Sequence, residues 1–266
     1  MTSRPFFRPL RVGAFVLGLA GLAACSGLAQ TPAARPPAGQ DSLPRTANGK
    51  PDLNGIWQVM NTAHVNLEPH SAAPGEPGGL GVVQGGEIPY QPAALARRRE
   101  NYEKRTSLDP LRKCFLPGVP RSTYLPFPFQ IAQTADHLAI AYEFAHTMRI
   151  IYTDGSPHPG PLDFWMGDSR GTWEGDTLAV ETTHFNDRTW FDMSGNYHSE
   201  ALKVTERFTL ADGGRRIDYQ ATMEDPKVFT RPWTISMPIH KRVEKDLQIV
   251  DYDCVDFFWT SLFNKK

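Results

Sequence analysis

The sequence predicts an all-β protein, an antiparallel β-barrel with one short helix and long loops. Its 266 residues are 40% hydrophobic and 21% charged, which is typical of a globular chain. The 23 Pro and 22 Gly residues favour short strands separated by turns over a helix bundle. From Phe129 onward, apolar and polar residues alternate, as they do in strands that bury one face. Roughly eight to ten such strands without helical crossovers close most economically as a barrel, since closure removes exposed edges.

An export signal is expected at the N-terminus. Three arginines among the first 11 residues precede an apolar run over residues 12–24, which is short for a membrane span. The run ends in Leu22-Ala23-Ala24-Cys25, which resembles the bacterial lipobox, in which the cysteine is lipid-modified and becomes the new N-terminus. We therefore expect Cys25 to anchor the protein by its lipid on the periplasmic side of the cell envelope, at the outer membrane. Ordinary cleavage near Ala29, which would remove Cys25, is the alternative.

The rest of the chain is expected to divide into a tether and one folded domain. Residues 25–45 are rich in Pro and Ala and poor in large apolar residues, so they cannot bury enough surface to fold and predict a disordered tether. Residues 46–266 are expected to form a single barrel domain. Within it, the Gly- and Pro-rich stretch 69–86 predicts a long loop, and residues 93–104 predict the one helix outside the signal.

The predicted strands are clearest in the second half of the chain. Alternation is strongest over residues 138–144, 202–208, 216–223 and 233–240, and residues 247–254 are expected to supply the last strand. Hairpin turns are predicted between strands by Asp154-Gly155, Gly175-Asp176 and Asp212-Gly213.

A family resemblance is carried by five short motifs. They are Pro51–Trp57, Pro117–Arg121, Tyr152–Gly155, Gly171–Leu178 and Phe185–Asp187. Together they resemble a large family of exported bacterial proteins of unassigned function, over nearly all of residues 46–256. The start Gly55-Ile56-Trp57 is also similar to the first strand of lipocalins, so the resemblance implies a lipocalin-like (calycin-type) barrel. It implies no catalytic residue.

The cysteines predict one disulfide. With Cys25 set aside, the chain has Cys114 and Cys254, and two thiols in an oxidising compartment can pair. The bond would join the loop at residues 114–118 to the C-terminal strand. Two small buried thiols are the alternative.

Charge and motifs exclude several function classes. With 28 basic and 29 acidic residues, the chain lacks the basic excess of nucleic-acid-binding proteins. The segment Gly167–Gly171 fits the G-x-S-x-G pattern, but neither the required strand before Ser169 nor the helix after it is expected. The histidines lack the spacing of a zinc site, and no phosphate-binding glycine loop occurs. We expect no metal and no cofactor.

Three titratable residues fall where the strand pattern places apolar residues. His198 and Glu206 share parity with the apolar positions of 202–208, and Asp225 shares the parity of the apolar positions in 216–223. A two-residue turn at Asp212-Gly213 would place position 206 opposite 219 and position 225 opposite 200. His198 and Asp225 would then form an acid/base pair at one mouth of the barrel, with Glu206 deeper in the lumen.

Each of these residues also has a structural interpretation. Glu206 can pair with an inward Arg149 or Arg207 and fix the barrel, because an unpaired buried charge is costly. Asp225, which precedes a proline, can cap a turn, and His198 can hydrogen-bond its own loop.

A second set of residues could hold a ligand. Tyr152, His158 and Trp165 lie in or beside one connection, and Asn186, Asp187 and Trp190 lie in the next, with Glu143 and Arg149 on a neighbouring hairpin. Aromatic rings interspersed with amides and carboxylates can stack on a ring and hydrogen-bond its substituents. The alternative is that Trp165 and Trp190 plug one end of the barrel.

The sequence thus favours an envelope lipoprotein that binds a small ring-bearing molecule in its barrel. A cofactor-free lyase, isomerase or hydrolase that uses His198, Asp225 and Glu206 is the alternative. A structural envelope protein would instead fill the lumen with side chains. Apart from a small molecule and the membrane reached through the lipid, no partner is expected, nucleic acid included.

Overall fold

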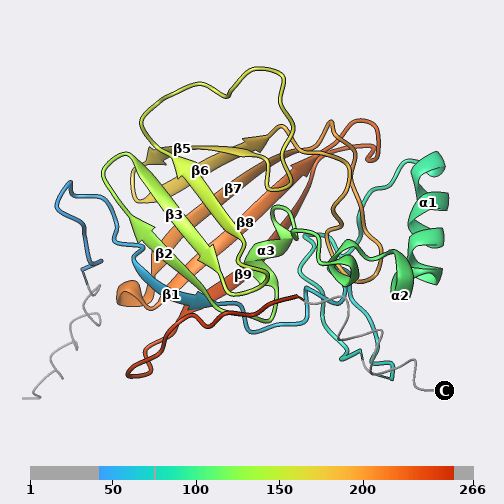
Figure 1. Cartoon of the computed structure of the whole chain (residues 1–266), viewed down its shortest axis with the longest axis horizontal. Coiled ribbons are helices and arrows are strands. Elements are labelled where there is room, and N and C mark those ends of the chain that lie inside the picture. Colours follow the sequence, from blue (N-terminus) through green and yellow to red (C-terminus); the bar gives the residue numbers. More distant parts are fainter. Residues whose placement is uncertain (1–41, 75, 255–266) are drawn as a thin grey trace, which may run out of the picture. The chain divides into compact units, whose positions relative to one another are not determined.

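The computed structural model describes residues 42–74 and 76–254, which form a closed barrel of nine strands (Figure 1). The strands follow one another around the barrel in chain order, and β9 pairs with β1 to close it. Their bounds are β1 Gly55–Gln58, β2 Phe129–Gln133, β3 His137–Tyr142, β4 Met148–Tyr152, β5 Asp168–Glu174, β6 Thr177–Thr183, β7 Lys203–Ala211, β8 Arg216–Glu224 and β9 Trp233–Lys241. The prediction of an all-β, lipocalin-like barrel is confirmed.

One seam departs from the antiparallel pattern. Strand β5 runs parallel to β4 and pairs with it at only two positions, Ile151 with Ser169 and Tyr152 with Arg170. The reason is the long connection 153–167, which arches over one edge of the barrel in Figure 1 and brings the chain back to enter β5 in the same direction. At Gly171 the two strands lie so close that a Cβ atom would be 2.9 Å from Ile151 Cγ2. This parallel seam and the closure between β9 and β1 have the fewest paired positions of the barrel, two each.

The interior of the barrel is filled with apolar side chains. Burial alternates along β7 and β8, so every second residue faces inward. The Pro51–Trp57 motif anchors the start of β1, since Asn54 Oδ1 accepts from the Gln133 backbone N–H at 2.7 Å and Trp57 Nε1 donates to the Leu53 carbonyl at 2.8 Å. Each fully buried large apolar side chain contributes about 1.5 to 3 kcal/mol. The motif is therefore explained by folding alone.

Four helical segments lie between β1 and β2 in the chain, and one short 3₁₀ turn lies between β7 and β8. Helix α1 spans Pro92–Glu103, one residue earlier than predicted, with Pro92 in its first turn, where a missing N–H costs nothing. Four further short segments were not predicted: α2 Arg105–Leu108, η1 Pro110–Lys113, α3 Arg121–Tyr124 and η2 Asp212–Gly214. All four residues of α3 are buried. None of the helices in the described ranges has the length and apolar character needed to cross a membrane.

The predicted last strand is wrong. Residues 247–254 form no named strand, and only Tyr252 makes an isolated bridge, to Phe144. The physical reason is that β9 already pairs with β1, so the closed barrel offers no free edge.

The predicted register between β7 and β8 is wrong by two residues. Glu206 pairs with Ala221, and Tyr219 pairs with Phe208. The pairing ends at Ala211 and Arg216, so the turn is longer than two residues, with Gly213 and Gly214 both at positive φ. Because the error is an even number of residues, Glu206 still faces the interior.

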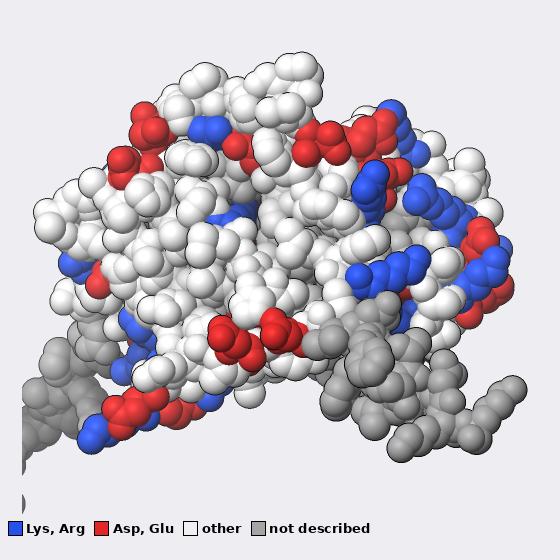
Figure 2. Space-filling model, in the orientation of Figure 1, with Lys and Arg blue, Asp and Glu red and all other residues white. Residues whose placement is uncertain are grey.

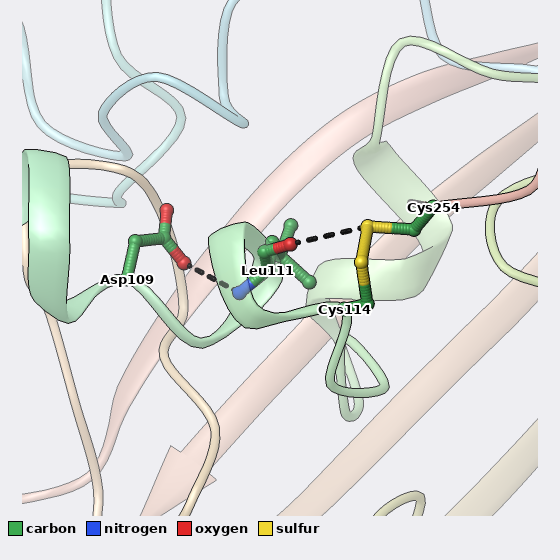
Figure 3. The surroundings of a disulfide bond; sticks show 4 residues. All are labelled: Asp109, Leu111, Cys114 and Cys254. Carbon is green, nitrogen blue, oxygen red and sulfur yellow. Dashed lines mark hydrogen bonds between the residues drawn. A yellow bond between two sulfur atoms is a disulfide. The ribbon is translucent and has the colours of Figure 1, made fainter. Parts of the chain in front are cut away.

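The predicted disulfide is confirmed. Cys114 and Cys254 are bonded, with their Cα atoms 5.3 Å apart (Figure 3). The Asp109 carboxylate accepts from the Leu111 backbone N–H at 3.1 Å and so fixes the η1 turn that carries Cys114. The bond spans 140 residues of sequence, for which the chain-entropy model gives about 4 to 5 kcal/mol. It ties the segment after β9 to the α2–η1 region.

The surface drawn in Figure 2 has its charges toward its edge. The centre of this face carries few charged side chains, and Lys, Arg, Asp and Glu alternate around it without one sign dominating. The predicted signal, Cys25 and nearly all of the tether at 25–45 lie outside the described residues.

Candidate functional site

A buried ion pair crosses the interior of the barrel. Arg149 of β4 makes a bidentate contact with Glu206 of β7, with Nη1 3.1 Å from Oε1 and Nη2 bonded to Oε2. Arg149 also donates to Ser169 Oγ on β5 and to Thr182 Oγ1 on β6, both at 2.9 Å. Tyr219 of β8 donates its hydroxyl to Glu206 Oε1 at 2.8 Å. Five consecutive strands are thus joined by one polar cluster.

The electrostatics of this cluster keep Arg149 charged. The side chains of Arg149 and Glu206 are 1% and 0% exposed. Burial alone would lower the pKa of Arg149, but the Glu206 carboxylate overcomes this and holds that pKa above its ordinary value. Burial, with the nearby Glu206 charge, raises the pKa of Tyr219 well above its ordinary value, so the phenol stays a donor. The structural interpretation of Glu206, with Arg149 as its partner, matches this geometry.

A cavity of about 410 Å³ opens beside the parallel seam. Its walls come from β4 and from the end of the connection that leads into β5, and they include Met148, Tyr152, Asp163, Phe164, Trp165 and Asp168. Arg149 and Ser169 also line it, so the cavity reaches the buried ion pair. The Tyr152 ring is covered by the Arg170 guanidinium at 4.5 Å, and the Trp165 ring packs against Phe115 at 4.8 Å. We call it the seam pocket.

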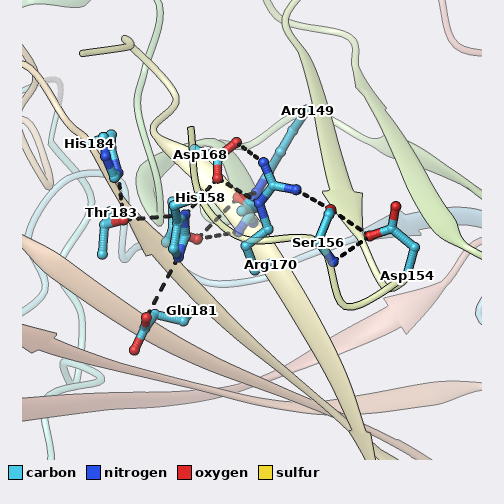
Figure 4. A network of polar contacts seen from close by, with 11 residues as sticks. Arg149, Asp154, Ser156, His158, Asp168, Arg170, Glu181, Thr183 and His184 are labelled. Atoms are coloured by element: carbon cyan, nitrogen blue, oxygen red, sulfur yellow. Dashed lines mark hydrogen bonds and ion pairs between the residues drawn. The ribbon is translucent and has the colours of Figure 1, made fainter. Parts of the chain in front are cut away.

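A histidine, His158, contacts Asp168, a carboxylate that lines the seam pocket (Figure 4). His158 Nδ1 is 2.6 Å from Asp168 Oδ2, and His158 Nε2 is 3.6 Å from Glu181 Oε1. Arg170 binds both Asp168 oxygens, at 2.7 and 2.9 Å. Burial would raise the pKa of Asp168, but the hydrogen bonds from Arg170 and His158 outweigh it and lower that pKa. The side chain of His158 is 23% exposed, so it can meet solvent and ligand.

No two of the three predicted catalytic residues are hydrogen-bonded to each other in the described structure. Glu206 is held by Arg149 and Tyr219, as described. The Asp225 carboxylate caps its own turn by accepting from the Lys227 backbone N–H at 3.0 Å, and it also accepts from the backbone N–H and the hydroxyl of Ser199 at 2.6 and 2.9 Å. His198 therefore has no hydrogen bond to Asp225 in the described part of the chain.

His198 itself is enclosed in its own loop. Its Nδ1 donates to the Ser199 carbonyl at 2.8 Å, and its Nε2 is 2.6 Å from Thr189 Oγ1. Burial lowers the pKa of His198, so the ring is neutral and both nitrogens are used. This environment suits a structural histidine.

The predicted ligand residues separate into two groups. Arg149, Tyr152 and Trp165 line the seam pocket, and His158 touches it through Asp168. The other four lie elsewhere: Glu143 accepts from the Val250 backbone N–H, Asn186 accepts from the Arg188 backbone N–H, Asp187 is exposed, and Trp190 is buried and bridged to Tyr197. Trp190 thus belongs to the buried core, whereas Trp165 is only partly buried.

Sequence reasoning missed the seam-pocket residues Met148, Asp163, Phe164, Asp168 and Leu116. A usable signal was the Asp168–Arg170 pair, two opposite charges on the same face of β5. No group of His, Cys, Asp or Glu within residues 42–74 and 76–254 is arranged to hold a metal ion. The chain matches no model of a protein family and no curated protein.

We expect Glu206→Gln to lower the free energy of unfolding by about 3 to 5 kcal/mol, because it leaves the Arg149 charge buried without a counter-charge. Urea denaturation measures this loss. Glu174→Gln is the control, since Glu174 pairs with Arg207 at 2.9 Å on the surface and such pairs contribute about 0 to 1 kcal/mol. Equal losses in the two variants would contradict the role assigned to the buried pair.

Proposed function

We propose that this protein binds a small ring-bearing molecule in the seam pocket. The observation that carries the proposal is the aromatic wall formed by Tyr152, Phe164 and Trp165 around about 410 Å³ of open space. Tyr152 and Phe164 are 39% and 38% exposed, so they leave a large apolar area open to the pocket. Rings of this kind favour a planar or cyclic ligand, which they contact by stacking and edge-to-face packing.

The polar groups of the pocket favour a ligand with a hydrogen-bond donor. Asp163 lines the pocket, and its carboxylate has no hydrogen-bond or ion-pair partner within the described ranges. Asp168 is ionised but is shared with Arg170 and His158. A hydroxyl group on the ring, as in a phenol, would supply the donor that Asp163 lacks. Phenols are therefore the first ligands to try.

Tyr152→Ala is expected to weaken phenol binding about tenfold, which corresponds to about 1.4 kcal/mol. Isothermal titration calorimetry with 4-hydroxybenzaldehyde and guaiacol measures this change. Tyr102→Ala is a matched control, because Tyr102 is also 40% exposed and is covered by Arg105 at 4.3 Å, but it is not part of the seam pocket. If both variants bind phenols like the parent, the pocket is not the binding site.

The proposed location is the periplasmic side of the cell envelope, with the protein attached by lipid on Cys25. The Cys114–Cys254 disulfide supports export, because disulfides persist in oxidising compartments. The lipobox-like Leu22–Cys25 segment supports lipid attachment.

The lipid proposal is tested by expressing the full chain in a Gram-negative host. The parent should partition into the detergent phase of Triton X-114, whereas Cys25→Ala should move to the aqueous phase or stay unprocessed. Ser26→Ala, which keeps the cysteine, should partition like the parent. Processing that is insensitive to globomycin would show that ordinary signal cleavage removes Cys25.

A second candidate function is cofactor-free acid/base catalysis on the same ligand. The observation that favours it is the His158–Asp168 contact of 2.6 Å at the rim of the seam pocket. The carboxylate orients the ring, while Nε2 is left for a ligand or for Glu181. In this proposal the proton-transfer role lies with His158, because the hydrogen bonds of His198 and Asp225 are already made to backbone and hydroxyl groups of the protein.

His158→Gln should abolish turnover of a ring-bearing ester or ketone while changing its dissociation constant less than threefold. Mass spectrometry of the products measures the rate. His146→Gln is the control, since His146 also contacts a carboxylate, that of Asp253, away from the pocket. An unchanged rate in His158→Gln would end the catalytic proposal and leave the binding proposal intact.

A further inference from the structure

A second cavity lies next to Arg121, between helix α3 and the C-terminal segment that carries Tyr252 and Cys254. It has a volume of about 260 Å³, and its lining includes Tyr252 and Cys254. None of its lining residues belongs to the seam pocket. We call it the α3 pocket.

The floor of the α3 pocket carries a buried ion pair with an unused donor. Arg121 donates from Nη1 and Nη2 to the two oxygens of Asp109, both at 2.8 Å, and its side chain is 1% exposed. The third guanidinium nitrogen, Arg121 Nε, has no hydrogen-bond partner in the described structure, and neither has His64 Nδ1, which lines the same cavity. Guanidinium groups do not lose their protons in proteins. A buried N–H without an acceptor costs free energy that an acceptor from a ligand would recover.

The α3 pocket is lined by Arg112, Arg121 and Asp109, and the buried Asp192 is close enough to act on the charge of Arg121. Arg121 and Asp109 cancel one another. Burial, with the nearby Arg121 charge, lowers the pKa of His64 to about 4, so His64 is neutral at pH 7. Arg112 lines the cavity and is exposed, and it has no ion-pair partner among the described residues. One uncompensated positive charge therefore stands at the edge of the cavity.

The opposite side of the α3 pocket is apolar and aromatic. Phe127, Phe144 and Tyr252 pack against one another, with ring centroids 4.7 to 5.8 Å apart. Leu125 and Met193 complete this surface. Three segments that are distant in the sequence thus supply one apolar wall of the cavity that Arg112 and Arg121 also line.

We propose that the α3 pocket binds a small carboxylate with an apolar body. The carboxylate is paired with Arg112 and accepts from Arg121 Nε, which gives the buried donor its missing acceptor. The apolar body packs on Phe127, Phe144 and Tyr252. This site is separate from the seam pocket and does not depend on the function proposed for it.

The disulfide fixes one wall of this site. Tyr252 and Cys254 follow the last strand, and the bond to Cys114 holds them against η1 (Figure 3). Without the bond, the segment at Tyr252 would lose its covalent tie to η1 and keep only non-covalent contacts, among them the bridge to Phe144 and the contact of Asp253 with His146. Ligand affinity is therefore expected to depend on the disulfide.

The test uses 2-naphthoate as the probe and 2-naphthamide as its uncharged analogue, with the full chain and fluorescence titration. Arg112→Gln should weaken 2-naphthoate at least tenfold and 2-naphthamide less than threefold. Lys113→Gln, which removes an adjacent exposed charge outside the pocket, should change neither. The disulfide-free variant Cys114→Ala/Cys254→Ala should weaken both probes, and Tyr252→Ala should do the same with the disulfide intact.

Three results would overturn the proposal. They are no binding of 2-naphthoate at millimolar concentration, equal losses in Arg112→Gln and Lys113→Gln, or a loss in Tyr152→Ala without one in Arg112→Gln. The last result would place the probe in the seam pocket. Retained binding in Tyr152→Ala together with weakened binding in Arg112→Gln supports the α3 pocket.

Discussion

The rest of the structure depends on the buried pair of Arg149 and Glu206. A barrel closed by hydrogen bonds is strong wherever its strands are long and antiparallel, but β4 and β5 share only two paired positions. Arg149 spans this weak junction from inside, because it binds Ser169 and Thr182 on the next two strands as well as Glu206. Isolated buried ion pairs often add little to stability. Here the additional hydrogen bonds satisfy the guanidinium and connect five strands.

The candidate site follows from the same constraint. A parallel entry into β5 requires the long connection 153–167, and that connection brings Phe164, Trp165 and Asp168 beside β4. A hairpin at this position would have paired β4 and β5 fully and left no cavity. The pocket is therefore found where the regular architecture is interrupted, next to a rigid ion pair that fixes its floor.

Much of the fold could be predicted from the sequence, because period-two alternation reports which face of a strand is buried. The alternation predicts that Glu206 faces the barrel interior, and an error of two residues in the predicted register does not change this. Contacts made by loops could not be predicted in this way. His198 and Asp225 share the right parity, yet His198 bonds within its own loop and Asp225 bonds Ser199 of that loop instead of the histidine. His158 and Asp168 meet because of the path of an irregular connection, which has no periodicity to read.

The central claim is that the Arg149–Glu206 pair holds the β4–β5 seam and thereby shapes the pocket. Hydrogen exchange of backbone amides in Glu206→Gln tests it most directly, because exchange resolves local opening from global unfolding. The account predicts that amides of β4 and β5 exchange at least about tenfold faster than in the parent, beyond any acceleration in β8 and β9. A uniform acceleration across the barrel, or none at the seam, would contradict it.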